Sequence, residues 1–306
     1  MSWELFAVFI GSSIRFAIPL LFAAIGELVS ERGGVLNMSL EGMMLVAAFA
    51  GAVASWATGS PMLGLLAGIV AAMLVALLQA FLSNTLRANQ IVTGIGINIL
   101  ALGATTLAYR EIFGARSRET IPGFDKWSPP LLGDIPVFGA AVFTQVWLAA
   151  FAILLIAGVW FVLRFTAFGI ALRAVGEDPQ AAQKSGLAVV RIRYAAVIFT
   201  GACCGLGGTF LSIGDLHTFT EGMVSGAGYI AITAVIFGNW HLGRTVIACF
   251  VFGAATALQY QLPAMGIDIP NALLIMSPYV LALIAVAGLA GRQRAPAALT
   301  IPYWGR

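Results

Sequence analysis

The sequence predicts an all-α membrane protein that crosses the bilayer several times. Of its 306 residues, 60% are hydrophobic and 9% are charged, and the mean hydropathy is +0.96. A soluble domain carries about 25% charged residues, and a water-soluble fold of this size could not cover so much apolar surface. Intrinsic disorder, which requires low hydrophobicity and high net charge, is excluded as well. Residues 1–306 are therefore predicted to form a single transmembrane domain.

About nine membrane helices are predicted, one or two of them short or discontinuous. A spanning helix needs about 20 mostly apolar residues. Runs without Asp, Glu, Lys or Arg occupy 42–56, 62–83, 91–109, 143–163, 194–213, 245–262 and 271–290, with a shorter run at 227–238. Residues 3–29 are also apolar, but Arg15 lies near their middle, where a charge is costly. We expect a break at 11–13, with 3–12 at the interface and a short membrane helix from 14 to 29.

The basic residues orient the chain. They gather in the loop 164–193 and in the tail at Arg292, Arg294 and Arg306. Placing both segments in the cytoplasm puts most of the 16 Lys and Arg residues inside, as the positive-inside rule requires. The N-terminus and the connection 110–142 are then external, and the C-terminus is cytoplasmic.

The segment 27–44 interrupts an apolar run. Two adjacent glycines, 33 and 34, are followed by three polar residues that could line a solute path: Asn37, Ser39 and Glu41. One interpretation is a short cytoplasmic loop with Glu31 and Arg32 in water. The other is a re-entrant break inside the membrane, of the kind that often builds a transporter's substrate site. The residues alone leave both open.

A second irregular segment, 213–229, carries Asp215, His217 and Glu221 before a short apolar helix. Its Glu221-Gly222-Met223 echoes Glu41-Gly42-Met43, which also precedes an apolar helix. Such echoes can mark internal repeats in transporters, although three matched residues are weak evidence. His217 is expected to be a solvated loop histidine.

The loop 164–193 contains a short helix with clear start and stop signals. Asp178 suits the N-cap, Pro179 the first helical position and Gly186 the position after the C-terminus. Glu177 at the start suits the positive end of the helix dipole. The sequence therefore predicts a helix over 179–185.

A helix of about seven residues is unstable alone, so its own bundle or a partner must hold it. Ala181 and Ala182 predict a smooth face that another protein could receive.

Several kinds of chemistry are excluded. The two lysines do not follow a GxxxxG run, so no Walker A loop is present and ATP cannot be hydrolysed by that route. The two histidines and three cysteines form no metal-ligand spacing, and the cysteines are expected to be buried small residues. No catalytic residue, metal site or nucleic-acid site is predicted.

A family resemblance rests on three stretches. GEDPQAAQKSGL (176–187) resembles the cytoplasmic signature of membrane-spanning subunits of ABC importers, in the group that serves ribose and other simple sugars, branched-chain amino acids and nucleosides. ERGGVLNMSLEGMM (31–44) is similar to the nucleoside branch of that group. GYIAITAVIFGNWHLGRTV (228–246) resembles its short helix and Gly-rich turn. The resemblance covers roughly 14–290.

This resemblance implies the permease fold and its partners. Such permeases pair as homo- or heterodimers, contact ATPase subunits that use the ATP, receive solute from an external binding protein, and lie in the bacterial plasma membrane. The segment 178–187, including Leu187, would be the coupling helix that docks on the ATPase. No cofactor is expected on this chain itself.

The expected solute is neutral and polar. The span interiors carry uncharged polar side chains, among them Thr93 and Asn98, which suit a nucleoside better than a zwitterion. Each of these residues can also simply join helices by hydrogen bonds. A simple-sugar or branched-chain amino acid permease is the alternative. An ion-coupled transporter is a further one, because sodium coupling through carbonyls at a broken helix is not excluded.

The orientation is testable by labelling. In the intact cell, a cysteine replacing Asp125 should react with an impermeant thiol reagent from outside, and one replacing Gln180 should not, because most of the basic residues are placed inside. The reverse labelling pattern would overturn this orientation.

Overall fold

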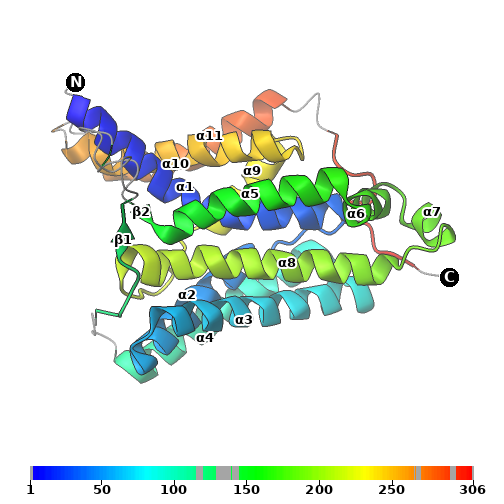
Figure 1. Cartoon of the computed structure of the whole chain (residues 1–306), viewed down its shortest axis with the longest axis horizontal. Helices are drawn as coiled ribbons and strands as arrows, with labels where there is room; N and C mark the ends of the chain where they lie inside the picture. Colours follow the sequence, from blue (N-terminus) through cyan, green and yellow to red (C-terminus); the bar gives the residue numbers. More distant parts are fainter. Residues whose placement is uncertain are drawn as a thin grey trace.

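The apolar runs of the sequence fold into a bundle of long helices in this computed structural model (Figure 1). The structure describes residues 3–114, 120–128, 139, 145–264, 266, 270–289 and 294–304. Its helices are α1 (Trp3–Arg32), α2 (Leu40–Thr58), α3 (Pro61–Ala80), α4 (Gln90–Phe113), α5 (Trp147–Phe165), α6 (Ala167–Glu177), α7 (Pro179–Lys184), α8 (Val189–Thr209), α9 (Ala227–Phe237), α10 (Leu242–Ala264) and α11 (Asn271–Leu289). Short π-helical turns, Phe81–Thr85 and Phe210–Leu216, extend α3 and α8.

The predicted apolar runs coincide with helices where the structure describes them, except that Gln145 and Val146 of the run 143–163 form strand β2. Within the described residues, seven helices are long and apolar enough to cross a membrane, and two apolar helices, Ala227–Phe237 and Ala272–Ile284, are shorter. The polytopic all-α class is confirmed, but the count of nine membrane helices is not. Residues 115–119, 129–138 and 140–142 of the expected external connection, 143 and 144 of the run that follows it, and Arg292 and Arg306 of the tail lie outside the described residues.

The expected break at 11–13 is wrong, because α1 continues without interruption from Trp3 to Arg32. At 1.5 Å per residue, Arg15 lies about 26 Å along the helix from Arg32, near one edge of a bilayer core and not at its centre. The charge is also paired: Arg15 Nε lies 2.5 Å from Asp215 Oδ1, just after α8. A continuous helix is therefore compatible with the arginine.

α8 is the central helix of the bundle and packs against α1, α2 and α3. Its glycines allow this close approach. A Cβ on Gly205 would lie 2.6 Å from the Cα of Ile69 in α3, and one on Gly208 would lie 2.1 Å from the carbonyl oxygen of Met44 in α2. Small residues are the usual means by which membrane helices pack backbone to backbone.

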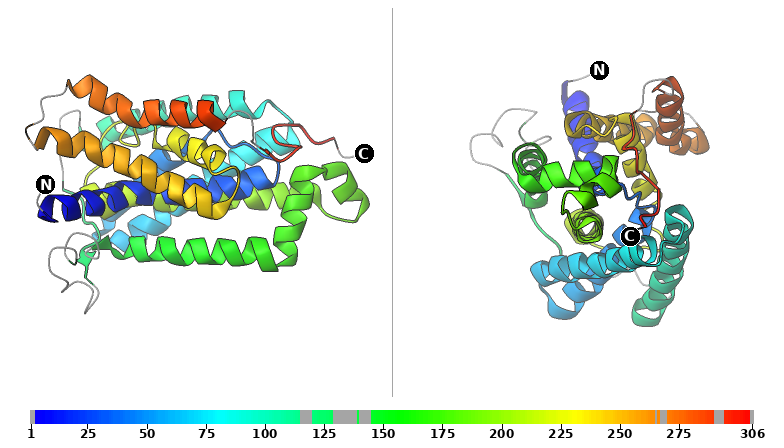
Figure 2. Two further views of the ribbon diagram at one scale, coloured as in Figure 1. Left: turned by 90° about the horizontal axis from the view of Figure 1, so that it is seen from above. Right: turned by 90° about the vertical axis from the view of Figure 1, so that its right-hand side faces the viewer.

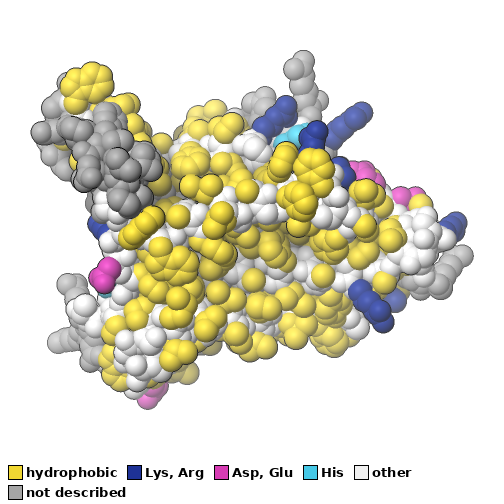
Figure 3. Space-filling view, viewed as in Figure 1, with side chains coloured by type: hydrophobic (Ala, Val, Ile, Leu, Met, Phe, Trp, Pro, Cys, Tyr) yellow, Lys and Arg dark blue, Asp and Glu magenta, His cyan; other side chains and the backbone are white. Residues whose placement is uncertain are grey.

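The two ends of the bundle are built differently (Figures 1 and 2). The hairpin of α6 and α7 lies at one end together with residues 294–304. At the other end lie the start of α1 and a two-residue antiparallel pairing of β1 (Lys126–Trp127) with β2 (Gln145–Val146). In Figure 3 hydrophobic side chains cover most of the face between these ends, as expected for a surface that meets lipid.

Arg15 and Asp215 should stabilise the fold only when both charges are present. Arg15→Gln should lower the thermal unfolding midpoint in detergent by roughly 2–8 °C, because the Asp215 carboxylate, whose side chain is 10% exposed, is left without its cation. The double variant Arg15→Gln, Asp215→Asn should recover much of this loss. A double variant that loses as much as the sum of the two single variants would show that the charges do not interact.

Candidate functional site

The predicted short helix is present as α7, and its ends are formed as expected. The Oδ1 of Asp178 accepts hydrogen bonds from the backbone N–H groups of Gln180 and Ala181, at 3.0 and 2.9 Å. Pro179 is the first helical residue. Gly186 has a φ of +86°, and its N–H donates to the carbonyl of Gln183. The helix ends at Lys184, one residue earlier than predicted.

The two alanines of α7 differ in exposure. Ala181 is exposed, whereas Ala182 is 4% exposed and packs with Val175 of α6 and Val189 of α8. The expected smooth alanine face is therefore wrong for Ala182, which contacts the chain's own hairpin. A bulky residue at that position would disrupt the hairpin before it met any partner.

Residues 294–304 fold back along the hairpin and brace it, a contact that the sequence analysis missed. The N–H of Ala298 donates to the carbonyl of Gly176 at 2.9 Å, and the Ala297 N–H donates to the Glu177 carboxylate at 3.4 Å. The hydroxyl of Tyr303 bonds the side-chain oxygen of Gln183. Leu187 and Tyr303 also pack on the small apolar cluster around Ala182.

The hairpin of α6 and α7 also contacts the end of α1. A Cβ on Gly176 would lie 2.1 Å from the carbonyl oxygen of Arg32, so only glycine fits between the two helices. Arg193 in the first turns of α8 is 1% exposed, and its Nε donates to the carbonyl of Gly33 at 3.2 Å. The short helix is thus connected through direct contacts to the turn that joins α1 and α2.

That turn, residues 33–39, lies inside the protein. Asn37, Ser39 and Glu31 are all 0% exposed, so the interpretation of a short cytoplasmic loop with Glu31 in water is wrong. The backbone groups are satisfied by side chains from other segments: Glu27 Oε1 accepts from the N–H of Asn37 at 2.8 Å, and Gln90 Oε1 from that of Leu36 at 2.8 Å.

Asn37 and Ser39 are bonded to each other. The Ser39 hydroxyl and N–H both donate to Asn37 Oδ1, at 2.6 and 3.1 Å. With no exposed surface, these two side chains hold the turn and do not face an open path.

The end of α1 is also joined to the turn between α9 and α10. The indole N–H of Trp240 donates to Glu31 Oε2 at 2.5 Å, and the Arg32 guanidinium donates twice to the Trp240 carbonyl. The sequence analysis assigned no role to Trp240 or to Glu27. Their partners lie far away in the chain, so no local pattern could have indicated these bonds.

Glu41 and Asn98, two of the predicted path residues, come together where α2 and α9 begin. The two carboxylate oxygens of Glu41 accept from the N–H groups of Gly226 and Gly228, at 2.7 and 2.8 Å. These N–H groups lie at the N-terminus of α9, where they have no partner within the helix and where the helix dipole also favours a negative charge. We call Glu41, Asn98, Gly226, Gly228 and Tyr229 the α2–α9 junction.

Asn98 in α4 completes the junction. Its Oδ1 accepts from the N–H of Gly42, and its Nδ2 donates to the Met38 carbonyl and the Tyr229 hydroxyl, each at 2.8 Å. Nearby, the Tyr279 hydroxyl donates to the Ser225 carbonyl at 2.7 Å. The exposed fractions of Tyr229 and Tyr279 are 37% and 44%, so both rings border the open side of the junction.

Thr93 is not part of the junction. Its hydroxyl donates to the carbonyls of Asn89 and Gln90 in its own helix, at 2.9 and 3.2 Å.

Glu221, whose tripeptide Glu221-Gly222-Met223 matches that of Glu41, has different partners from Glu41. It bonds the Arg110 guanidinium at 2.7 and 3.1 Å, and this hydrogen bond lowers the pKa of the Glu221 carboxyl below its ordinary value.

Comparisons with known proteins match this architecture over nearly the whole chain. Residues 9–290 match the family described as "Branched-chain amino acid transport system / permease component". The chain is 37% identical to the guanosine ABC transporter permease NupQ of Bacillus subtilis, over 98% of this chain and 97% of that one. It is 34% identical to the nucleoside ABC transporter permease NupC of Lactococcus lactis, over 97% and 96%.

A permease assigned to a glucose ABC transporter of Haloferax volcanii, TsgC13, is 36% identical over 89% of this chain and 83% of that one. Among solved structures, an ABC transporter assigned to the metal-chelate type, in an inward-facing conformation, matches with a TM-score of 0.51 at 15% identity. That match covers 92% of this chain and 85% of the other, and it bears on the fold alone. The chain therefore belongs to the branched-chain amino acid transport system permease family, and it is a multi-pass membrane permease of an ABC transporter.

Proposed function

We propose that this permease forms part of the translocation path of an importer for nucleosides. The observation that supports this most is the similarity, over nearly the full length, to permeases named for guanosine and for nucleosides. The α2–α9 junction is compatible with such a solute. It offers the hydroxyl groups and rings of two partly exposed tyrosines, Tyr229 and Tyr279, and aromatic rings pack well on planar bases.

The permease would act with other subunits. In this proposal a separate ATPase hydrolyses the ATP, a second permease, identical or different, completes the path, and an external binding protein delivers the solute. The membrane is the bacterial plasma membrane, and the hairpin of α6 and α7 and the C-terminal residues face the cytoplasm.

We assign the coupling role to the exposed side of α7. Its capped ends and its packing on α6 and α8 make it a rigid projection at one end of the bundle (Figure 2). A movement of α7 would reach α1 through Gly176 and Arg32, and the α1–α2 turn through Arg193. From that turn, α2 carries the movement to Glu41, which holds the start of α9.

A sugar is the second candidate solute, favoured by the relative assigned to glucose transport. A branched-chain amino acid fits less well. Its carboxylate calls for a cation, whereas the α2–α9 junction as defined above contains no basic side chain and one acidic one, Glu41. Competition of labelled guanosine uptake by ribose, glucose and leucine in the reconstituted transporter distinguishes the three.

The coupling role can be tested on the exposed alanine of α7. Ala181→Trp should reduce both copurification of the ATPase and solute-stimulated ATP hydrolysis at least tenfold, because an indole at this exposed position blocks a close-fitting contact. The matched control is Ala57→Trp, an exposed alanine at the end of α2 on the opposite end of the bundle. Full copurification and full transport with Ala181→Trp would rule out α7 as the docking element.

The solute path can be tested on the tyrosine hydroxyls. Tyr279→Phe should raise the KM for guanosine uptake roughly threefold to tenfold, the effect of one lost hydrogen bond, with assembly unchanged. Tyr260→Phe in α10 is the control, because that ring is exposed and stacks on Phe16. An unchanged KM in both Tyr279→Phe and Tyr229→Phe would place the path elsewhere.

A further inference from the structure

A basic pocket opens at the end of the bundle that carries the α6–α7 hairpin. It has a volume of about 280 Å³ and lies where α1 and α5 end and α10 begins. Three arginines from three helices line it, Arg32, Arg164 and Arg173, together with two tryptophans, Trp160 and Trp240. In Figure 3 basic side chains cluster at this end of the visible face.

These arginines line one pocket without a direct ion pair to a carboxylate in the described part of the chain, and the charge of Glu177 acts on Arg32 from a longer distance. The two ion pairs found within the described residues, Arg15–Asp215 and Arg110–Glu221, involve none of the three. Arg32 is fixed in place, because its Nε and Nη2 donate to the carbonyl of Trp240 at 2.9 and 2.5 Å. A preformed cluster of guanidinium groups is the arrangement that recognises a phosphate.

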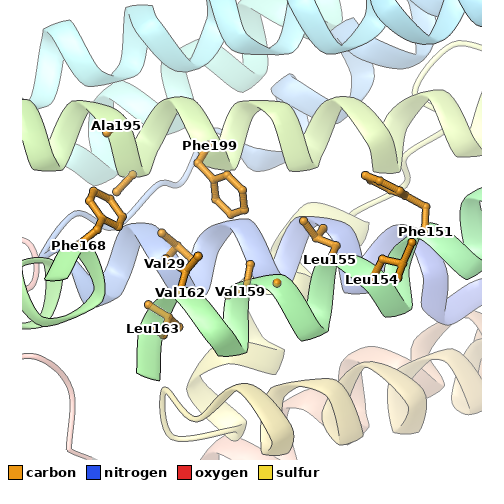
Figure 4. Close-up of a pocket in the computed structure, with 12 residues that line it drawn as sticks. Val29, Phe151, Leu154, Leu155, Val159, Val162, Leu163, Phe168, Ala195 and Phe199 are labelled. Atoms are coloured by element: carbon orange, nitrogen blue, oxygen red, sulfur yellow. The ribbon is translucent and has the colours of Figure 1, made fainter. Parts of the chain in front are cut away.

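An apolar groove adjoins this pocket. It has a volume of about 530 Å³ and lies between α5 and α8, with Val29 of α1 at its floor and Phe168 of α6 at one end (Figure 4). Leu163 lines both the groove and the basic pocket. A molecule that occupies both must therefore have an anionic head and an apolar tail.

We propose that an anionic phospholipid binds at the end of α5, with its phosphate among the three arginines and one acyl chain in the groove. Trp160, at the mouth of the pocket, is 50% exposed, as is common for tryptophans at the level of lipid headgroups. Basic pockets between membrane helices on the cytoplasmic side suit anionic headgroups. The proposal goes beyond the proposed function and depends on it only for assigning this end to the cytoplasmic leaflet.

The position of this site bears on the contact between the bundle and the hairpin of α6 and α7. A lipid in this site would touch α1 at Arg32 and α6 at Arg173, the two helices that meet at Gly176. It would therefore stabilise the contact between the bundle and the hairpin of α6 and α7.

Native mass spectrometry of the detergent-purified transporter tests the proposal. Titration with dioleoyl-phosphatidylglycerol should show one bound lipid at lower concentration than any other, whereas dioleoyl-phosphatidylcholine should not reproduce it. Arg164→Gln and Arg173→Gln should each weaken this first binding event roughly fivefold. The matched control is Arg191→Gln, an exposed arginine in the first turn of α8 outside the pocket.

Two further arms separate a lipid from a simple anion. Gly158→Phe should weaken binding of the long-chain lipid, since a Cβ on Gly158 meets nothing within 4 Å and the ring would fill the groove. It should not affect dihexanoyl-phosphatidylglycerol. Displacement of the lipid by millimolar inorganic phosphate, or equal retention by the Arg164→Gln, Arg173→Gln and Arg191→Gln variants, would overturn the proposal.

Discussion

The structure depends on how this chain satisfies backbone groups where helices end inside the bundle. Water does not reach backbone groups that are buried in the protein, so each open N–H and C=O must find a partner there. The turn between α1 and α2 meets this requirement with Glu27, Gln90 and Asn98, and the start of α9 meets it with Glu41. Several buried polar side chains, Glu27, Gln90 and Asn98 among them, therefore serve the turn between α1 and α2.

The same bonds connect parts of the molecule that could otherwise move separately. Glu41 attaches the start of α2 to the start of α9, and Trp240 attaches the end of α1 to the end of α9. The central packing of α8 on α1, α2 and α3 holds these helices at backbone contact distance. A displacement at the α6–α7 hairpin would consequently reach the α2–α9 junction through rigid elements.

Features set by neighbouring residues could be predicted from the sequence, whereas contacts between residues far apart in the chain could not. The apolar runs and the caps Asp178, Pro179 and Gly186 follow from neighbouring residues, so the sequence indicates them directly. Arg15 misled the sequence analysis because its partner, Asp215, is 200 residues away. Ala182 was misplaced because a six-residue helix does not reveal which side its own hairpin will cover. Glu41 was correctly singled out, but nothing local shows that it bonds Gly226.

The brace formed by residues 294–304 has a consequence for biosynthesis. These residues leave the ribosome after all of the helices, yet they supply the bonds to Gly176, Glu177 and Gln183 that hold the hairpin. The hairpin can therefore form early but acquires its support late in translation. A nascent or truncated permease without residues 294–304 therefore lacks a fully braced hairpin.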